Sequence, residues 1–190
     1  ILSSGVKKDL PEIVLIEDYN AKKYLESYPG AFADLTDHFN YSEFASYKLD
    51  FMTVNDRVYG VPFDSGVAGW FYRRDYFEEA GIDVSELGNI TMDEYIELGK
   101  VFKEKTGRYM QAGDPYDGGL MRTLLQSAGT WYFDEKGEPN IVNNPALKEA
   151  VRIYKEINDS GISKETSGWN EWVAAFNGGE VASVITGVWI

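Results

Sequence analysis

Among the side chains that could bind a ligand or take part in chemistry, aromatic rings and carboxylates are the most numerous in this sequence of 190 residues. It contains 5 Trp, 13 Tyr and 10 Phe residues, and 31 Asp and Glu residues against 18 Lys and Arg residues. The net charge of −13 disfavours binding to nucleic acid or to an anionic membrane, whereas a neutral or cationic ligand is easier to accommodate. The aromatic residues either fill the core or face such a ligand.

Several kinds of reactive site are excluded by composition. The sequence has no cysteine, which excludes disulfides, thiolate metal sites and cysteine nucleophiles. The single histidine, His38, has no Asp, Glu or Cys at ligand spacing, so we expect it in a surface loop and not in a metal site. A serine nucleophile is not indicated either, because there is no G-x-S-x-G motif. We therefore expect no catalytic residues, no cofactor and no metal.

The length suits one large domain or two small ones. There is no run of eighteen apolar residues, so no segment is expected to span a membrane. The first residues lack the pattern of a signal peptide. If the protein is exported, its targeting segment has been removed.

Residues 59–81 contain the most informative stretch. Two apolar, β-favouring runs, 58–63 and 68–72, are separated by the polar residues 64–66. Pro62 lies inside the first run and has no amide to donate, which argues against a central strand. We interpret the stretch as a point where the chain leaves one sheet for another, followed by a short helix over 75–80.

The elements before this stretch are shorter. Residues 13–16 form a continuous apolar run that predicts a buried parallel strand, with polar residues at its carboxyl end, where ligands gather in open α/β sheets. A helix is predicted over 20–28, and residues 41–50 are also expected to be helical.

The elements after this stretch alternate between helices and strands. Thr91 and Glu94 form a capping box that begins a helix running to about Lys105. Asn144 before Pro145 begins a helix that ends near Gly161. Further helices are predicted over 118–129 and 171–176, and a strand over 181–185. This order predicts an α/β fold.

Five blocks of this sequence resemble extracellular solute-binding proteins of family 1, the carbohydrate-binding components of ABC importers, to which maltose-binding protein belongs. The blocks occur in the order expected of the family and cover nearly the whole chain. They are YGVPFDSGVAGWFYRRDYFEEAGI, TMDEYIELGK, LLQSAGTWYFDEKGEP, NNPALKEAVRIYKEINDSGI and AFNGGEVASVITGVW.

The resemblance implies a periplasmic-binding-protein-like fold with two lobes, a ligand cleft and chain crossovers that act as a hinge. Residues 1–63 would belong to the N-terminal lobe, 64–66 to the hinge crossover and 67–190 to most of the C-terminal lobe. The hinge residues would be Phe63, Asp64, Ser65 and Gly66. The family has further strands before Ile1 and after Ile190, so the resemblance also implies a fragment truncated at both ends.

The resemblance also implies where a sugar would bind, since sugars need flat rings to stack on and polar groups at the edge. Trp189 matches the family's tryptophan that stacks on the sugar; core packing is its alternative. Trp131, with Tyr132 beside it, lies where relatives carry a stacking aromatic, and otherwise covers the end of the helix over 118–128. Either Trp169 or Trp172 is expected to face the cleft.

Three carboxylates complete the candidate site. Asp64 lies in the crossover turn and would accept hydrogen bonds from sugar hydroxyls, or would cap Gly66 or Val67 as a turn aspartate. Glu17 and Asp18 line the same cleft in the family pattern, or else cap the helix near Asn20.

The function implied by the resemblance is capture of a sugar or oligosaccharide for delivery to an ABC permease. Such a protein would be a monomer, in the periplasm or lipid-anchored on the extracellular face of the membrane. One alternative is a polyamine-binding protein of the same fold, because an acidic cleft with aromatic rings suits a cation. A glycoside hydrolase is the other, although no block resembles a hydrolase motif.

Overall fold

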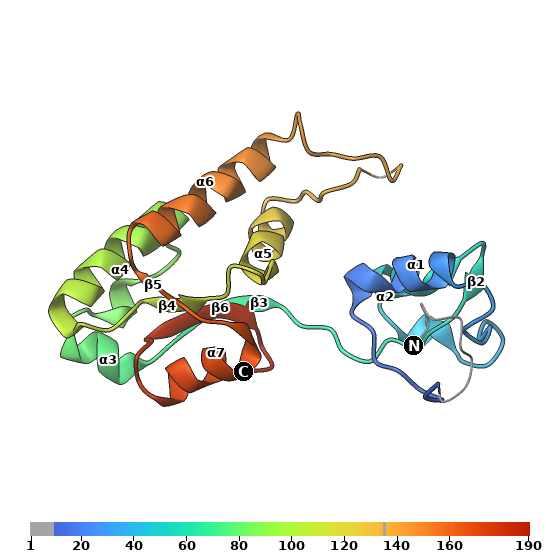
Figure 1. The fold of residues 1–190 in the computed structure, drawn as a ribbon, viewed down its shortest axis with the longest axis horizontal. Helices are drawn as coiled ribbons and strands as arrows, with labels where there is room; N and C mark the ends of the chain where they lie inside the picture. Colours follow the sequence, from blue (N-terminus) through green and yellow to red (C-terminus); the bar gives the residue numbers. More distant parts are fainter. Residues whose placement is uncertain (1–9, 135) are drawn as a thin grey trace. The chain divides into compact units, whose positions relative to one another are not determined.

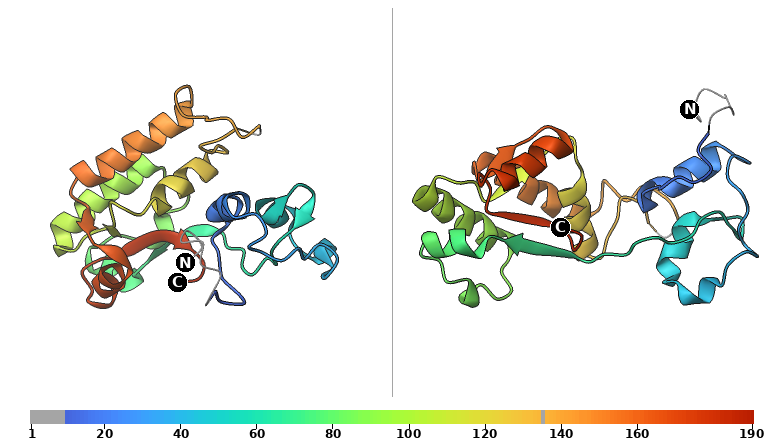
Figure 2. Two further views of the ribbon diagram at one scale, coloured as in Figure 1. Left: turned by 45° about the vertical axis from the view of Figure 1, so that its right-hand side comes forward. Right: turned by 90° about the horizontal axis from the view of Figure 1, so that it is seen from below.

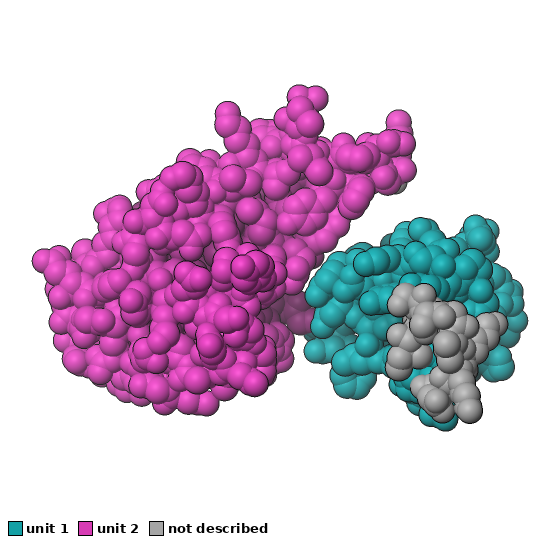
Figure 3. Space-filling model, viewed as in Figure 1, with its two compact units in different colours: residues 1–65 teal, residues 66–190 magenta. Residues whose placement is uncertain are grey.

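The computed structural model describes residues 10–134 and 136–190. The chain divides between Ser65 and Gly66 into two compact units, Ile1–Ser65 and Gly66–Ile190 (Figures 1 and 3). In the described ranges no helix has both the length and the apolar character needed to cross a membrane.

The first unit is built from short helices and one hairpin. Helices α1 and α2 pack against each other, and strands β1 and β2 pair antiparallel. Asn55 and Asp56 form the hairpin turn at positive φ, which these two residue types tolerate. The predicted helix over 20–28 is confirmed as α1, and the predicted helical residues 41–50 form two separate elements, η2 and α2. The elements are α1 (Asp18–Ser27), η2 (Tyr41–Glu43), α2 (Ser46–Met52), β1 (Thr53–Val54) and β2 (Arg57–Val58).

The prediction of a buried strand over 13–16 is wrong. These residues belong to no strand, and the side chains of Ile13 and Leu15 are 91% and 78% exposed. A parallel strand is stable only when a neighbouring strand satisfies its backbone groups. Among the described residues none pairs with this segment.

Asp34 connects the loop after α1 to the hairpin. Its carboxylate accepts hydrogen bonds from the Thr36 hydroxyl (2.6 Å) and amide (3.0 Å), and from Arg57 Nε at 2.5 Å. The Thr36 hydroxyl in turn accepts a bond from the Val58 amide (3.0 Å). The bonds from Thr36, followed by the ion pair with Arg57, lower the pKa of Asp34 from 3.8 to about 2.

We expect this carboxylate to make the stability of the first unit depend on pH. Because the pKa is lower in the folded state, the stabilisation is present above pH 3.8 and is lost as the pH falls through about 2. Asp34→Asn should therefore destabilise the unit at neutral pH and flatten its loss of stability on acidification. Urea unfolding at about pH 7 and at about pH 2.5, followed by amide NMR signals of this unit, measures the difference.

Asp37→Asn is the matched control, because the Asp37 carboxylate lies 3.8 Å from the same guanidinium but makes none of the bonds to Thr36. An equal change in both variants would mean that Arg57 alone is responsible.

Residues 59–67 have no regular secondary structure. The predicted strand over 58–63 is therefore wrong beyond Val58, where β2 ends. Pro62 has no amide for a ladder, and the amide of Tyr59 donates to the carbonyl of Met52 (3.0 Å) at the base of the hairpin. The second predicted strand is confirmed as β3 (Ala68–Tyr72).

The second unit contains two pairs of strands. Strand β3 pairs antiparallel with β6 (Ser183–Gly187), and β4 (Gln111–Gly113) pairs parallel with β5 (Ser163–Glu165). A parallel bridge between Tyr109 and Val181 connects the two pairs. Because β3 runs from Ala68 and β6 ends opposite it at Gly187, the first and last parts of this unit lie side by side (Figure 1).

Helices cover these strands and supply most of the core. The main cluster takes buried residues from α3, α4 and α6, including Phe77, Phe102 and Ile157, and α7 packs on a smaller cluster with Ala175 and Val181. Helices α4 and α6 contact each other, as Figure 2 also shows. The bounds are α3 (Arg74–Glu79), η3 (Val84–Glu86), α4 (Met92–Thr106), α5 (Gly119–Ser127), α6 (Pro145–Asp159) and α7 (Gly168–Asn177).

The predicted helix ends are confirmed where local caps define them. Thr91 and Glu94 form the capping box of α4, which ends before Gly107 at φ 72°, a conformation that favours glycine. The side chain of Asn144 accepts from the Leu147 amide (3.1 Å) at the start of α6. The prediction over 118–129 is confirmed as α5, that over 171–176 is part of the longer α7, and the strand over 181–185 is β6, shifted by two residues.

Candidate functional site

Three tryptophan side chains gather on the second unit. The rings of Trp169 and Trp172 are stacked, with centroids 5.2 Å apart and planes at 25°. Trp189 lies against both, at 5.4 Å from Trp169 and 6.2 Å from Trp172. We call these three residues the tryptophan platform. Trp169 is 60% exposed and Trp189 55%, so two large apolar rings face solvent.

The tryptophan platform packs on the core of the second unit through Trp172. Trp172 is half-buried and packs against Phe176 (5.0 Å between centroids) and the small cluster of Ala175 and Val181. Trp189 follows β6 and lies directly on Gly187, where an added Cβ would stand only 2.6 Å from its Nε1. A residue larger than glycine at 187 would therefore displace this indole.

This arrangement suits a ligand with flat apolar faces and hydroxyls at its rim. Exposed indole faces stack on C–H bonds, while the Nε1–H groups donate hydrogen bonds. The structure thus brings Trp169 and Trp189 together in one cluster, although Trp169 precedes the predicted helix over 171–176 and Trp189 follows the predicted strand over 181–185.

Sequence reasoning missed a second group of residues beside β4 and β5. The two strands run parallel to each other. In α/β sheets, ligands bind at the carboxyl ends of such strands. Asp114 and Tyr116 follow β4, and Tyr116 is 93% exposed. Thr166 follows β5 and is buried. The sequence signal for this strand end is the turn motif D-P-Y-D at residues 114–117, which follows the small residues Ala112 and Gly113.

The side-chain oxygen of Thr166, Oγ1, is buried and has no hydrogen-bond partner in the described parts of the chain. A buried hydroxyl without a partner costs stability. We expect Thr166→Val to raise the free energy of unfolding by about 1 kcal/mol, measured by urea unfolding of the full-length protein.

Thr106→Val is the matched control and should lower stability, because the Thr106 hydroxyl donates to the carbonyl of Phe102 (2.9 Å) and accepts from the amide of Arg108 (3.1 Å). A loss of stability in Thr166→Val would show that its hydroxyl does have a partner in solution.

Trp131 and Tyr132 form a separate aromatic pair, with centroids 5.1 Å apart. Both are half-buried and lie after α5, in a hairpin-like loop where the Asn140 amide donates to the carbonyl of Tyr132 (2.7 Å). Asn140 Nδ2 also donates to the carbonyl of Trp131 (3.2 Å). No ring contact is found between this pair and the tryptophan platform among the described residues.

The two carboxylates of the first unit differ in their contacts. Glu17 stands at the N-cap position of α1, but its exposed side chain makes no capping bond. Asp18 forms an ion pair with Lys48 (2.6 Å), which ties α1 to α2. Asp18 thus has a structural contact, whereas Glu17 leaves its carboxylate open to solvent.

The four predicted hinge residues lie in the segment without regular structure. Phe63 is 84% exposed, and Asp64 is exposed without a bond to the amides of Gly66 or Val67, so the capping alternative is not observed. The Ser65 hydroxyl hydrogen-bonds that of Tyr47 on α2. Gly66 begins the second unit.

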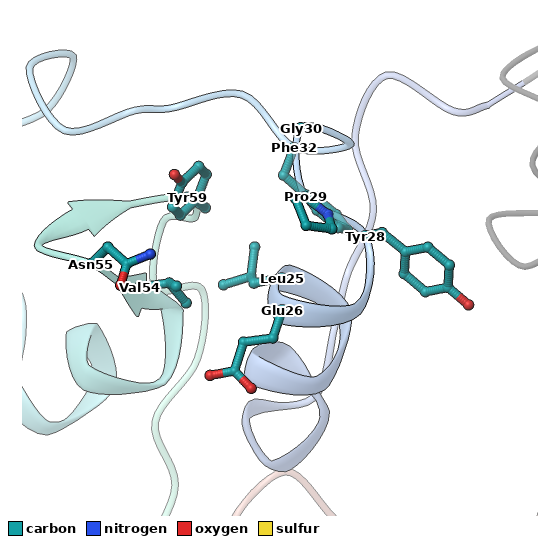
Figure 4. Close-up of a pocket in the computed structure, with 9 residues that line it drawn as sticks. All are labelled: Leu25, Glu26, Tyr28, Pro29, Gly30, Phe32, Val54, Asn55 and Tyr59. Carbon is teal, nitrogen blue, oxygen red and sulfur yellow. The ribbon is translucent and has the colours of Figure 1, made fainter.

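The first unit also contains a pocket of about 330 Å³ between the end of α1 and the β1–β2 turn (Figure 4). Leu25, Tyr28, Phe32 and Tyr59 give it a largely apolar wall. It contains none of the predicted site residues. His38 is exposed in a turn, as predicted, and the described ranges hold no cluster of His, Cys, Asp or Glu that suits a metal ion.

Known proteins resemble this chain over its whole length. It is 53% identical over 189 residues to the lactose-binding protein of Rhizobium radiobacter, a match that covers 100% of this chain and 45% of that protein. It is 25% identical over 185 residues to the arabinooligosaccharide-binding protein of Halalkalibacterium halodurans, covering 94% of this chain and 41% of that protein. The chain therefore spans less than half the length of these relatives.

Solved structures confirm the α/β fold of the periplasmic-binding-protein type. The GacH receptor of Streptomyces glaucescens superposes with a TM-score of 0.80 at 22% identity, over 97% of this chain and 47% of that one. The galacto-N-biose-/lacto-N-biose I-binding protein of Bifidobacterium longum gives 0.65 at 25% identity, over 83% and 40%.

The family profile described as bacterial extracellular solute-binding protein matches residues 2–190. This match includes all five sequence blocks that carry the predicted resemblance. The 53% identity over 189 residues to the lactose-binding protein agrees with it. The chain belongs to the bacterial extracellular solute-binding protein family.

Proposed function

We propose that this chain is part of the sugar-binding component of an ABC importer, and that its ligand is a disaccharide of the lactose type. The observation that carries the proposal is the 53% identity to a lactose-binding protein across 189 residues. The tryptophan platform supports it, because exposed indole rings suit the apolar face of a pyranose ring.

In this proposal the two compact units belong to the two lobes, and residues 63–66 form the hinge. Ligand contacts come from Trp169, Trp189 and the Trp131–Tyr132 pair on one lobe, with Glu17 and Asp64 as hydrogen-bond acceptors. The closed form makes contacts from both lobes, so sugar shifts the population toward it. The population shifts only as far as the sugar binds the closed form more tightly than the open one.

The remaining parts of the proposal concern the complete protein. It acts by binding and not by catalysis, as a monomer that delivers sugar to the permease subunits. It works outside the cytoplasm, in the periplasm or on a lipid anchor at the outer face of the membrane. The membership of an extracellular family supports this placement.

Titration calorimetry of the full-length protein tests the proposal. We expect heat of binding with lactose, and weaker or no heat with maltose, mannitol, an arabino-oligosaccharide and spermidine. No heat with any sugar would contradict the sugar-binding function, and heat with spermidine alone would favour a polyamine carrier. Release of reducing ends from an oligosaccharide would instead show a glycoside hydrolase.

A further inference from the structure

The carboxylate of Asp114 links two segments that are far apart in the sequence. Its Oδ2 accepts a hydrogen bond from the amide of Gly168 (2.7 Å), 54 residues away. Its Oδ1 accepts from the amide of Tyr116 (2.8 Å) in its own loop. One half-buried side chain thus fixes the backbone on both sides of the β4–β5 strand ends.

Both amides bound by the Asp114 carboxylate are next to exposed aromatic rings: Gly168 precedes Trp169, and the other amide is that of Tyr116 itself. Gly168 is the first residue of α7 and directly precedes Trp169 of the tryptophan platform. Tyr116 carries its ring out into solvent. Any rotation of the Gly168 peptide would therefore move Trp169 against Trp172 and Trp189, with which it is in ring contact.

Among residues 10–134 and 136–190, the other hydrogen bonds near the start of α7 do not connect it to a side chain of the loop after β4. Glu171 accepts from the Ser167 amide (2.7 Å), which is a contact within the same segment. The Thr166 amide donates to the carbonyl of Gly113 (3.0 Å) and continues the strand ladder by one residue. In the described parts of the chain, Asp114 is the side chain whose hydrogen bond ties the start of α7 to the loop after β4.

We infer that Asp114 is a positioning residue for the sugar site. It sets the place of Trp169 and of Tyr116 through their backbone, while the rings contact the ligand. Ionised carboxylates form stronger hydrogen bonds to amides than neutral acceptors do, which suits this task. The inference rests on the proposed function, because it assumes that the tryptophan platform binds sugar.

Two substitutions at Asp114 remove its hydrogen-bond acceptors to different extents. Asp114→Ala removes both acceptors, while Asp114→Asn keeps one carbonyl oxygen and replaces the other acceptor by a donor. Asp117→Ala is the matched control in the same loop, because Asp117 Oδ1 accepts from the nearby Gly119 amide (2.9 Å) and does not bond to α7.

Lactose affinity and amide exchange are measured on the full-length protein and on these three variants. We expect Asp114→Ala to weaken binding roughly tenfold, Asp114→Asn to weaken it less, and Asp117→Ala to leave it nearly unchanged. Without sugar, exchange of the Gly168 amide proton should become faster in Asp114→Ala and stay unchanged in Asp117→Ala.

The outcomes distinguish this inference from the proposed function. Unchanged affinity in Asp114→Ala, or an equal loss in Asp117→Ala, would overturn the positioning role while wild-type protein still binds sugar. A wild-type protein that binds no sugar would instead overturn the proposed function, whatever the exchange of the Gly168 amide.

Discussion

Replacing Trp189 with alanine is expected to weaken sugar binding by roughly 1 to 3 kcal/mol, a loss of about five- to more than a hundredfold in affinity. The side chain is 55% exposed and meets Trp169 at 5.4 Å, so it offers a ring face without filling the core. Its removal deletes the stacking surface and leaves Trp169 without one of its two ring neighbours. Titration calorimetry with lactose on the full-length protein gives the difference.

Two further variants sharpen this result. Trp189→Phe keeps a smaller ring and should recover part of the affinity. Phe39→Ala removes an exposed aromatic ring of the other unit, outside the candidate site, and should leave the affinity unchanged. If Trp189→Ala lowered stability and left the affinity intact, the residue would be a packing residue and not a stacking one.

How far the sequence predicts this structure depends on how local the signal is. Helices α4 and α6 are predicted well because Thr91, Glu94 and Asn144 satisfy the first backbone amides within a single turn. The strand over 13–16 fails for the opposite reason. Its apolar run is genuine, but strand formation requires a partner elsewhere, which a local pattern does not reveal.

The candidate site shows the same limit. The residue types of Trp169 and Trp189 mark them as candidates, but their contact depends on the start of α7 meeting the segment that follows β6. Strands β4 and β5 are only three residues long, with sequences QAG and SKE, and lack the apolar alternation that marks a strand. Asp114 is therefore invisible as a link to Gly168 until both strands are paired.

The largest loss of stability is expected from Phe102→Ala, at about 3 to 5 kcal/mol. Phe102 is fully buried in the main cluster of the second unit, with its ring 5.0 Å from that of Phe77 at 31°. Phe77 in turn meets Trp70 (5.9 Å) and Tyr72 (5.3 Å) on β3, so the cavity would open beneath the strand that begins this unit.

Val101→Ala is the matched control for this substitution. Val101 precedes Phe102 on α4 but is 43% exposed, and alanine has the better helix propensity, so stability should change little. Urea unfolding of the full-length protein, followed by tryptophan fluorescence, compares the two variants; the five tryptophans of this 190-residue sequence all lie in the second unit. A loss below about 1 kcal/mol for Phe102→Ala would mean that the cluster collapses around the missing ring, since the cost of such a cavity depends on how far its walls relax.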